Sequence, residues 1–223
     1  MKKIMNSILK QLFSSKNPRF NSAKYWEERY RTGGNSGTGS YNEIAMFKAT
    51  VINKLLKEYR IEGVTEFGCG DGNQLSLLEM PKYIGLDVSN SIIQFCIEKF
   101  ESDKNKNFFL YNTKSFLDNH GVFKNDCAMS IDVLFHLVEA DIYQKYLHHV
   151  FETADRIVII YAADFELPQR SPHELYRSFT KYINSEFPDW RLDKFIKNDY
   201  PSATYDDEKG SLADFFVYRR IKD

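Results

Sequence analysis

Three glycines at every second position mark the segment with the clearest chemical meaning. Gly68, Gly70 and Gly72 follow the apolar run Val64 to Phe67, which is typical of the end of a buried strand. Glycine is favoured in such a turn because it adopts positive φ and lets the backbone approach a ligand closely. The segment therefore predicts a turn that binds a nucleotide-like cofactor, with a helix beginning at Asn73.

The glycine spacing separates two classes of cofactor. A dinucleotide fingerprint, Gly-x-Gly-x-x-Gly, would place its third glycine at position 73, where the chain has Asn73. A nicotinamide-dependent oxidoreductase is therefore disfavoured. The glycine stretch at 33–39 lacks the lysine of a phosphate-binding loop, because Ser40 stands in its place.

A second acidic position supports a ribose-containing ligand. Asp87 ends the apolar segment that begins at Tyr83. In a doubly wound sheet such a carboxylate lies above the first glycine turn and accepts hydrogen bonds from both ribose hydroxyls. The alternative is a surface aspartate that caps the helix beginning near Ser91.

Two histidines are candidate catalytic residues. His136 follows a predicted strand over 127–131, and an imidazole there is able to take a proton from an attacking hydroxyl because it titrates near neutral pH. The alternative is a histidine that only packs among apolar neighbours. His173 lies between Arg170 and Arg177 in a segment that predicts an anion-binding face, although a solvated helix explains the same charges.

Alternation of short apolar strands with helices predicts an α/β fold with a mostly parallel sheet. Two closing strands with no helix between them predict a final antiparallel strand. The predicted strands cover 64–67, 83–86, 107–111, 127–131, 156–161, 190–196 and 212–219, and the predicted helices cover 24–31, 44–63, 74–79, 90–100 and 140–152.

The composition limits the classes of protein. A chain of 223 residues with 43% hydrophobic residues fits one ordinary globular unit. Its 30 basic and 31 acidic residues give a net charge of -1, so no global field favours nucleic acid. Three cysteines without metal or disulfide spacing favour a reducing cytoplasm and predict no metal site.

The first twenty residues combine lysines with apolar residues at helical intervals. Polar residues interrupt that apolar set, so we expect neither a signal peptide nor stable membrane insertion. A helix that packs on the domain or on a partner is the simpler interpretation, and weak membrane association is the alternative.

The pattern acid-x-Gly-x-Gly-x-Gly, formed by Glu66 and the three glycines, resembles motif I of the class I S-adenosylmethionine (SAM) methyltransferases. With Asp87 and the segment Met129 to Glu139, the resemblance covers roughly residues 60 to 165. It implies a Rossmann-like seven-stranded sheet with an antiparallel last strand and an N-terminal helical lid. It also implies SAM as methyl donor and S-adenosylhomocysteine as product. The implied organisation is a helical extension and lid over 1–60 and a SAM-binding domain over 61–223.

The resemblance also assigns roles to individual residues. Lid residues before the glycine-rich stretch are expected to close over the cofactor, although a flexible connector with a packed aromatic helix is the alternative. Asn112 or Thr113 takes the adenine-contact position, which is commonly acidic in the family. The implied cofactor-binding residues are Glu66, Gly68, Gly70, Gly72, Asp87, Ser130, Tyr25, Trp26, Tyr30, Arg31, Asn112 and Thr113.

A finer resemblance concerns the acceptor. The stretch from Gly34 to Tyr41, followed by Phe47-Lys48-Ala49, is similar to methyltransferases encoded in bacterial capsule or surface-polysaccharide gene clusters, including those linked to O-methyl phosphoramidate. This implies methyl transfer to an oxygen of a small molecule, with a homodimer as one open arrangement. A phosphoramidate would need Arg170 or Arg177, whereas a sugar hydroxyl would need His136 or His173 as base. A SAM-binding protein without catalytic activity is the alternative.

Overall fold

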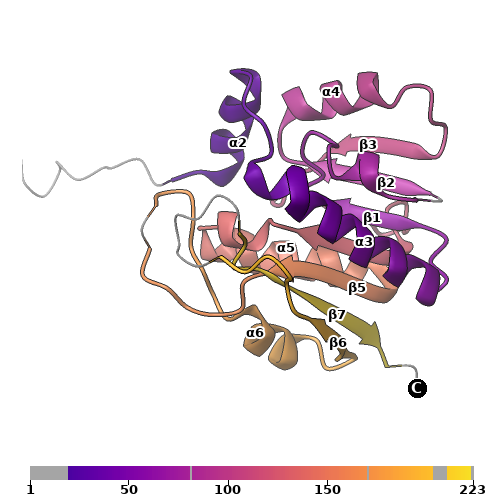
Figure 1. Ribbon diagram of the computed structural model, residues 1–223, viewed down its shortest axis with the longest axis vertical. Coiled ribbons are helices and arrows are strands. Elements are labelled where there is room, and N and C mark those ends of the chain that lie inside the picture. The colour runs from indigo at the N-terminus through magenta and orange to yellow at the C-terminus, as the bar shows by residue number, and fades with distance from the viewer. Residues whose placement is uncertain (1–19, 81, 170, 203–209, 222–223) are drawn as a thin grey trace, which may run out of the picture.

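The computed structural model describes residues 20–80, 82–169, 171–202 and 210–221, which form a seven-stranded sheet in the order β3-β2-β1-β4-β5-β7-β6 (Figure 1). The first five strands are parallel, and β7 runs antiparallel to both β5 and β6, which confirms the predicted sheet. The strands are β1 (Val64–Phe67), β2 (Tyr83–Asp87), β3 (Lys106–Leu110), β4 (Asn125–Ile131), β5 (Ala154–Ala162), β6 (Trp190–Ile196) and β7 (Asp214–Arg220).

Helices cover both faces of the sheet (Figure 1). On one face, α3 supplies Ile52 and Leu55 to a core shared with Tyr83 and Val217; α5 packs Leu147 into the core of the other face. The predicted boundary at residues 60 and 61 stays a prediction, and α3 shares its core with the strands that follow. The helices are α2 (Ser22–Arg31), α3 (Asn42–Glu58), α4 (Asn90–Lys99), α5 (Ala140–Thr153) and α6 (Phe179–Glu186).

The helix predicted after the glycine turn is wrong. Only a single 3₁₀ turn, η2 (Leu75–Leu77), forms there. The side chain of Asn53 in α3 donates to the carbonyl of Leu77 at 3.2 Å and accepts from the backbone N–H of Glu79 at 2.9 Å. These bonds satisfy the backbone outside a helix, so the chain is extended at Leu78, where it leaves the 3₁₀ turn.

The helix predicted within the first twenty residues, and its packing on the domain or on a partner, concern residues 1–19, which lie outside the described residues. Among the residues the structure does describe, no helix combines the length and apolar character needed to cross a bilayer. Cys69, Cys96 and Cys127 are buried free thiols.

The glycine turn after β1 adopts the left-handed conformation at all three glycines, with φ of 83° at Gly68, 56° at Gly70 and 66° at Gly72. Neighbouring protein atoms occupy the space that a side chain would need. A Cβ on Gly68 would lie 2.5 Å from Val133, and one on Gly72 would lie 2.6 Å from Phe100. These glycines are therefore required by backbone conformation and by packing of the protein itself.

We expect Gly72→Ala to lower the free energy of unfolding by about 2 to 4 kcal/mol, because it adds a left-handed alanine and a clash with Phe100. Gly33→Ala is the matched control, since Gly33 has φ of 85° with no atom within 4 Å of the added Cβ. It should cost only about 1 kcal/mol. Equal losses in urea denaturation would show that the Phe100 contact does not matter.

Candidate functional site

A cavity of about 450 Å³ lies at the carboxyl edge of the parallel strands, beneath α2. This is the edge where open α/β sheets bind their ligands. The turn, the end of β2, the segment after β3 and the segment after β4 all reach it. Of the predicted site residues, those that line it are Trp26, Tyr30, Glu66, Gly68, Gly70, Asp87, Asn112, Thr113 and His136.

Asp87 lies at the centre of this edge. Its two carboxylate oxygens accept backbone N–H groups, from Gly70 at 3.1 Å and from Ser89 at 2.9 Å. Burial raises the pKa of Asp87 to about 6, although those hydrogen bonds favour the charged form. The carboxylate retains further lone pairs at the cavity wall, as a diol-binding acid requires.

Glu66 is a second buried acid of the cavity. Its carboxylate accepts a hydrogen bond from the hydroxyl of Tyr83 at 2.5 Å. Burial raises the pKa of Glu66 to about 7, and the Tyr83 bond and the charge of Lys48 only partly offset that effect. Near neutral pH the group therefore exchanges between its charged and neutral forms.

Lys48 and Asp132 form an ion pair in the cavity wall, with Lys48 Nζ 2.6 Å from the Asp132 carboxylate. The lysine side chain is 1% exposed, and its ammonium lies 5.3 Å from the centre of the Tyr161 ring. Asp132 has φ of 59°, which is strained for an aspartate. Opposite charges at one end of the cavity suit a zwitterionic ligand.

Gln74 adds an acceptor without a donor to the same wall. Its Nε2 donates to the carbonyl of Ala45 at 3.1 Å, but its buried Oε1 has no hydrogen-bond partner among the described residues. A buried polar atom without a partner is costly, so a ligand donor at this position would stabilise the site.

Asp71 ties the glycine-rich segment before α3 to the turn. Its carboxylate accepts the N–H of Ser36 at 2.9 Å and the hydroxyl of Tyr41 at 2.8 Å, and its own N–H donates to Ser36 Oγ. Burial opposes the charge of Asp71, but the hydrogen bonds from Ser36, Asn73 and Tyr41 outweigh it and lower the pKa. The carboxylate is therefore charged and used within the protein.

Helix α2 is attached to the domain at three points. At its start, the N–H of Ser22 donates to Glu139 at 3.0 Å. In its middle, Glu27 accepts the hydroxyls of Ser89 and Ser91 at 2.6 Å each, which lowers its pKa. Near its end, the Tyr30 hydroxyl lies 3.1 Å from Ser36 Oγ.

His136 has a defined tautomer. Its Nδ1 lies 3.2 Å from the carbonyl oxygen of His173, and a carbonyl only accepts, so Nδ1 carries the proton and Nε2 has the lone pair. Burial lowers the pKa of His136 to about 4. The imidazole is therefore neutral at pH 7, with the Trp26 ring edge-on to it at 4.8 Å between centroids.

Three other candidates lie outside the cavity lining. The ring of His173 stacks on Tyr25 at 4.7 Å and lies parallel to the ring of His136 at 6.0 Å, and its Nδ1 is 2.6 Å from Ser171 Oγ. Its carbonyl oxygen is the atom that hydrogen-bonds to His136. Arg31 is exposed and pairs with Glu28 at 2.6 Å. The lid contacts predicted for Tyr25 and Arg31 gain no support from this arrangement.

The remaining candidates that the structure describes contact other parts of the protein. Ser130 is fully buried and accepts the hydroxyl of Tyr146 at 2.7 Å, and Gly72 faces Phe100 instead of the cavity. Arg177 donates to the carbonyls of Leu137 and Val138 at 2.7 and 2.8 Å. Its guanidinium is thereby committed to the segment after β4, whereas Arg170 lies outside the described residues.

Solved structures with a similar fold are methyltransferases. The N-methyltransferase NodS from Bradyrhizobium japonicum WM9, solved with S-adenosylhomocysteine, superposes with a TM-score of 0.69 at 14% identity, over 91% of this chain and 100% of that chain. The chain has the class I methyltransferase fold. No protein-family model and no curated protein sequence matches it.

Other proteins with the methyltransferase fold match at similar length. The magnesium protoporphyrin IX methyltransferase ChlM from Synechocystis PCC 6803, with bound SAM, has a TM-score of 0.63 at 14% identity, over 92% of this chain and 100% of that chain. The methyltransferase domain of bacterial CtHen1-C has a TM-score of 0.60 at 22% identity, over 79% and 98%. Nitrogen-methylating enzymes are therefore among the structures that share the fold.

Sequence reasoning missed the lysine and several acids of this site. Lys48 and Asp132 are 84 positions apart, and although both lie in segments that carry a resemblance, neither side chain was assigned a role. Asp71, which lies between two motif glycines, was visible as an acid in the turn but had no assigned partner. Among the described residues, no group of three or more His, Cys, Asp or Glu side chains is arranged to hold a metal ion.

We expect Glu66→Gln to change how stability depends on pH. Between the unfolded pKa of 4.5 and the folded value of about 7, native Glu66 holds a proton that the unfolded chain has lost, so its contribution to stability falls as pH rises through this window. The free energy of unfolding of Glu66→Gln, minus that of the wild type, should rise from pH 4.5 to 7 and then level off. The surface variant Glu152→Gln serves as control, and a flat difference for Glu66→Gln would contradict the assignment.

Proposed function

We propose that this protein is a SAM-dependent methyltransferase that acts on an oxygen of a small-molecule acceptor. The observation that carries the proposal is Asp87, a buried carboxylate held by the Gly70 N–H at the carboxyl edge of β2 and facing the cavity. Its position suits a ribose diol, and the fold is shared with methyltransferases solved with SAM or its product.

The cavity offers partners for each part of SAM. Asp87 would hold the ribose hydroxyls, and Asn112 or Thr113 would contact the adenine. Lys48 would bind the carboxylate of the methionine moiety, and Asp132 its ammonium group, because their ion pair lies in the same wall. Bound SAM supplies an activated methyl group, so the protein has to orient the acceptor and exclude water.

His136 is the proposed base for a hydroxyl acceptor. The carbonyl of His173 fixes the Nδ1–H tautomer, which leaves Nε2 able to accept the hydroxyl proton. The neutral imidazole at pH 7 is the competent form for this step. The role of His173 in this proposal is positional, through its backbone.

The charges of the cavity favour an uncharged acceptor. Of the described residues that line it, Lys48 and Lys114 are the ones with amines, and the guanidinium of Arg177 donates to backbone carbonyls. We therefore favour a sugar-type hydroxyl as acceptor over an anionic phosphoramidate or a nucleic acid. The setting that we propose is the decoration of surface polysaccharide in a reducing cytoplasm. The carboxyl groups of the lining are Glu66, Asp71, Asp87, Asp132, Glu139 and Asp141.

Calorimetric titration with SAM and with NAD tests the cofactor. We expect the wild type to bind SAM and not NAD, and Asp87→Ala to weaken SAM binding about 10- to 100-fold, since it removes charge-assisted hydrogen bonds to the ribose. Asp189→Ala, which removes an exposed acid far from the cavity, should bind as the wild type does. Equal SAM affinity in the wild type and Asp87→Ala would refute the central proposal.

His136→Gln tests the base. With a hydroxyl acceptor, we expect kcat to fall about 100-fold or more while the dissociation constant of SAM changes little. An anionic acceptor would retain most of its rate in the same variant. A wild-type protein that binds SAM but methylates no acceptor in a cell extract would support the non-catalytic alternative.

A further inference from the structure

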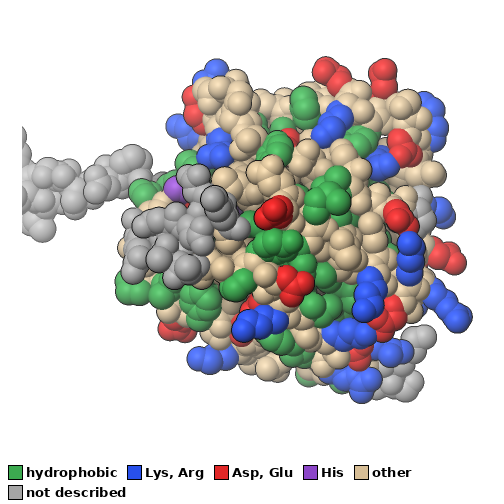
Figure 2. All heavy atoms as spheres, in the orientation of Figure 1, with side chains coloured by type: hydrophobic (Ala, Val, Ile, Leu, Met, Phe, Trp, Pro, Cys, Tyr) green, Lys and Arg blue, Asp and Glu red, His purple; other side chains and the backbone are tan. Residues whose placement is uncertain are grey.

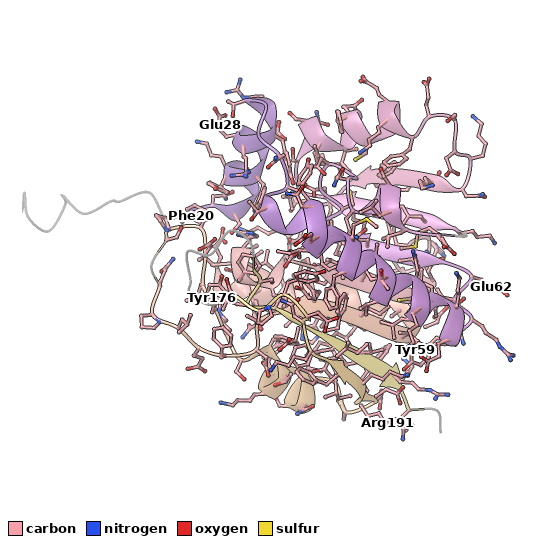
Figure 3. The ribbon with its side chains drawn as sticks, viewed as in Figure 1. Phe20, Glu28, Tyr59, Glu62, Tyr176 and Arg191 are labelled. Atoms are coloured by element: carbon pink, nitrogen blue, oxygen red, sulfur yellow. The ribbon has the colours of Figure 1, made fainter. Side chains whose placement is uncertain are left out.

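A second hollow, of about 580 Å³, lies where the amino end of β5, the carboxyl end of α3 and the β6–β7 pair meet. Figure 2 shows blue side chains gathered over this part of the surface, and Figure 3 places Tyr59 and Arg191 beside it. It is at the opposite edge of the sheet from the cavity beneath α2. The arginines that line it are Arg60, Arg156, Arg191, Arg219 and Arg220.

Two of the five arginines have structural partners. Arg156 donates to Asp126 at 3.0 Å and to the carbonyls of Tyr59 and Arg60 at 3.4 and 3.1 Å, and so caps the carboxyl end of α3. Arg220 lies over the Trp190 ring, 4.8 Å from its centre. Their positions are explained by the fold.

The other three guanidinium groups have no hydrogen-bond or ion-pair partner among the described residues. Arg191 and Arg219 stand directly opposite each other on neighbouring antiparallel strands, and both are exposed. Like charges at directly paired positions destabilise a sheet. Arg60 adds a third positive charge. Its φ is 50°, a backbone conformation that is strained for residues other than glycine.

The acids near the hollow do not balance this charge. Glu58 forms an ion pair with Lys194, and Asp193 accepts the Tyr59 hydroxyl at 2.5 Å. Asp155 is the remaining acid of the lining. Among the described residues, carboxylates thus compensate the charge of the arginine cluster only in part.

We propose that this hollow binds the phosphate group of a small phosphorylated molecule. Arg191 and Arg219 would each present a planar fork to the phosphate oxygens, and Arg60 would complete the charge. The volume exceeds that of a lone phosphate and is ordinary for a small-molecule site, so part of the hollow is left for an organic group. The proposal does not depend on methyl transfer at the other edge of the sheet.

Calorimetric titration of the 223-residue chain with pyrophosphate, and separately with ADP, tests this site. We expect saturable binding of both in the wild type and at least tenfold weaker binding in the double variant Arg191→Gln/Arg219→Gln. Tighter binding of ADP than of pyrophosphate would indicate that the organic group contacts the hollow. Lys104→Gln, which removes an exposed cation just before β3, the outer strand farthest from β6, should bind like the wild type.

The double variant should be at least as thermally stable as the wild type without ligand, because it removes a like-charge pair, and its SAM titration should be unchanged. Those two readouts separate loss of the site from misfolding. Absence of saturable pyrophosphate and ADP binding in the wild type would overturn the proposal. Wild-type affinity in the double variant, or an equal loss in Lys104→Gln, would overturn it as well.

Discussion

The left-handed turn after β1 is the constraint on which the rest of the site depends. A residue from another part of the chain packs against each of its glycines, in the space that a side chain would occupy. Val133 after β4 packs against Gly68, Ser36 before α3 against Gly70, and Phe100 after α4 against Gly72. One backbone conformation therefore sets the spacing of three distant segments. The cavity has its shape because these segments close on the same few residues, and a side chain on any of the glycines would force one of them away.

Buried acids give the carboxyl edge of the sheet its chemical character. Their burial lowers the stability of the fold. Raising the pKa of Asp87 from 3.8 to about 6 corresponds to about 3 kcal/mol of lost stability at pH values where the group is charged in both states. Backbone N–H groups at Asp87 and the Tyr83 hydroxyl at Glu66 offset part of the cost. Such a cost is typical of a site kept for function, since perturbed acids in a cavity are rare elsewhere in a fold.

Local patterns predicted the architecture well. The positions of the strands along the chain, the glycine turn and Asp87 follow from spacing and apolar runs of a few residues, and so does the antiparallel closing strand. The helix after the turn failed because Asn53, from a different element, satisfies the backbone there. A single sequence carries no signal for that contact.

The parts of the site that escaped prediction all depend on long-range contacts. Lys48 and Asp132 meet because α3 crosses the end of β4. Arg177 was predicted to bind an anionic substrate, but its guanidinium donates to backbone carbonyls of the protein. The ring of His173 was expected to act as a base; it lies parallel to the ring of His136, and the peptide oxygen of His173 makes the hydrogen bond to His136. Residue type indicates what a side chain is able to do, whereas packing decides which of its atoms is used.

The three attachments of α2 have a consequence for exchange kinetics. Hydrogen bonds of Ser22, of Glu27 with Ser89 and Ser91, and of Tyr30 hold the helix, and at a net of about 0.5 to 1.5 kcal/mol each they amount to several kcal/mol together. A ligand beneath α2 would thus have a residence time governed partly by the opening of the helix. A mutation in α2 that contacts no ligand can therefore speed the release of the ligand while the residues that bind it stay unchanged. The rate of release and the contacts that bind the ligand can thus be altered separately.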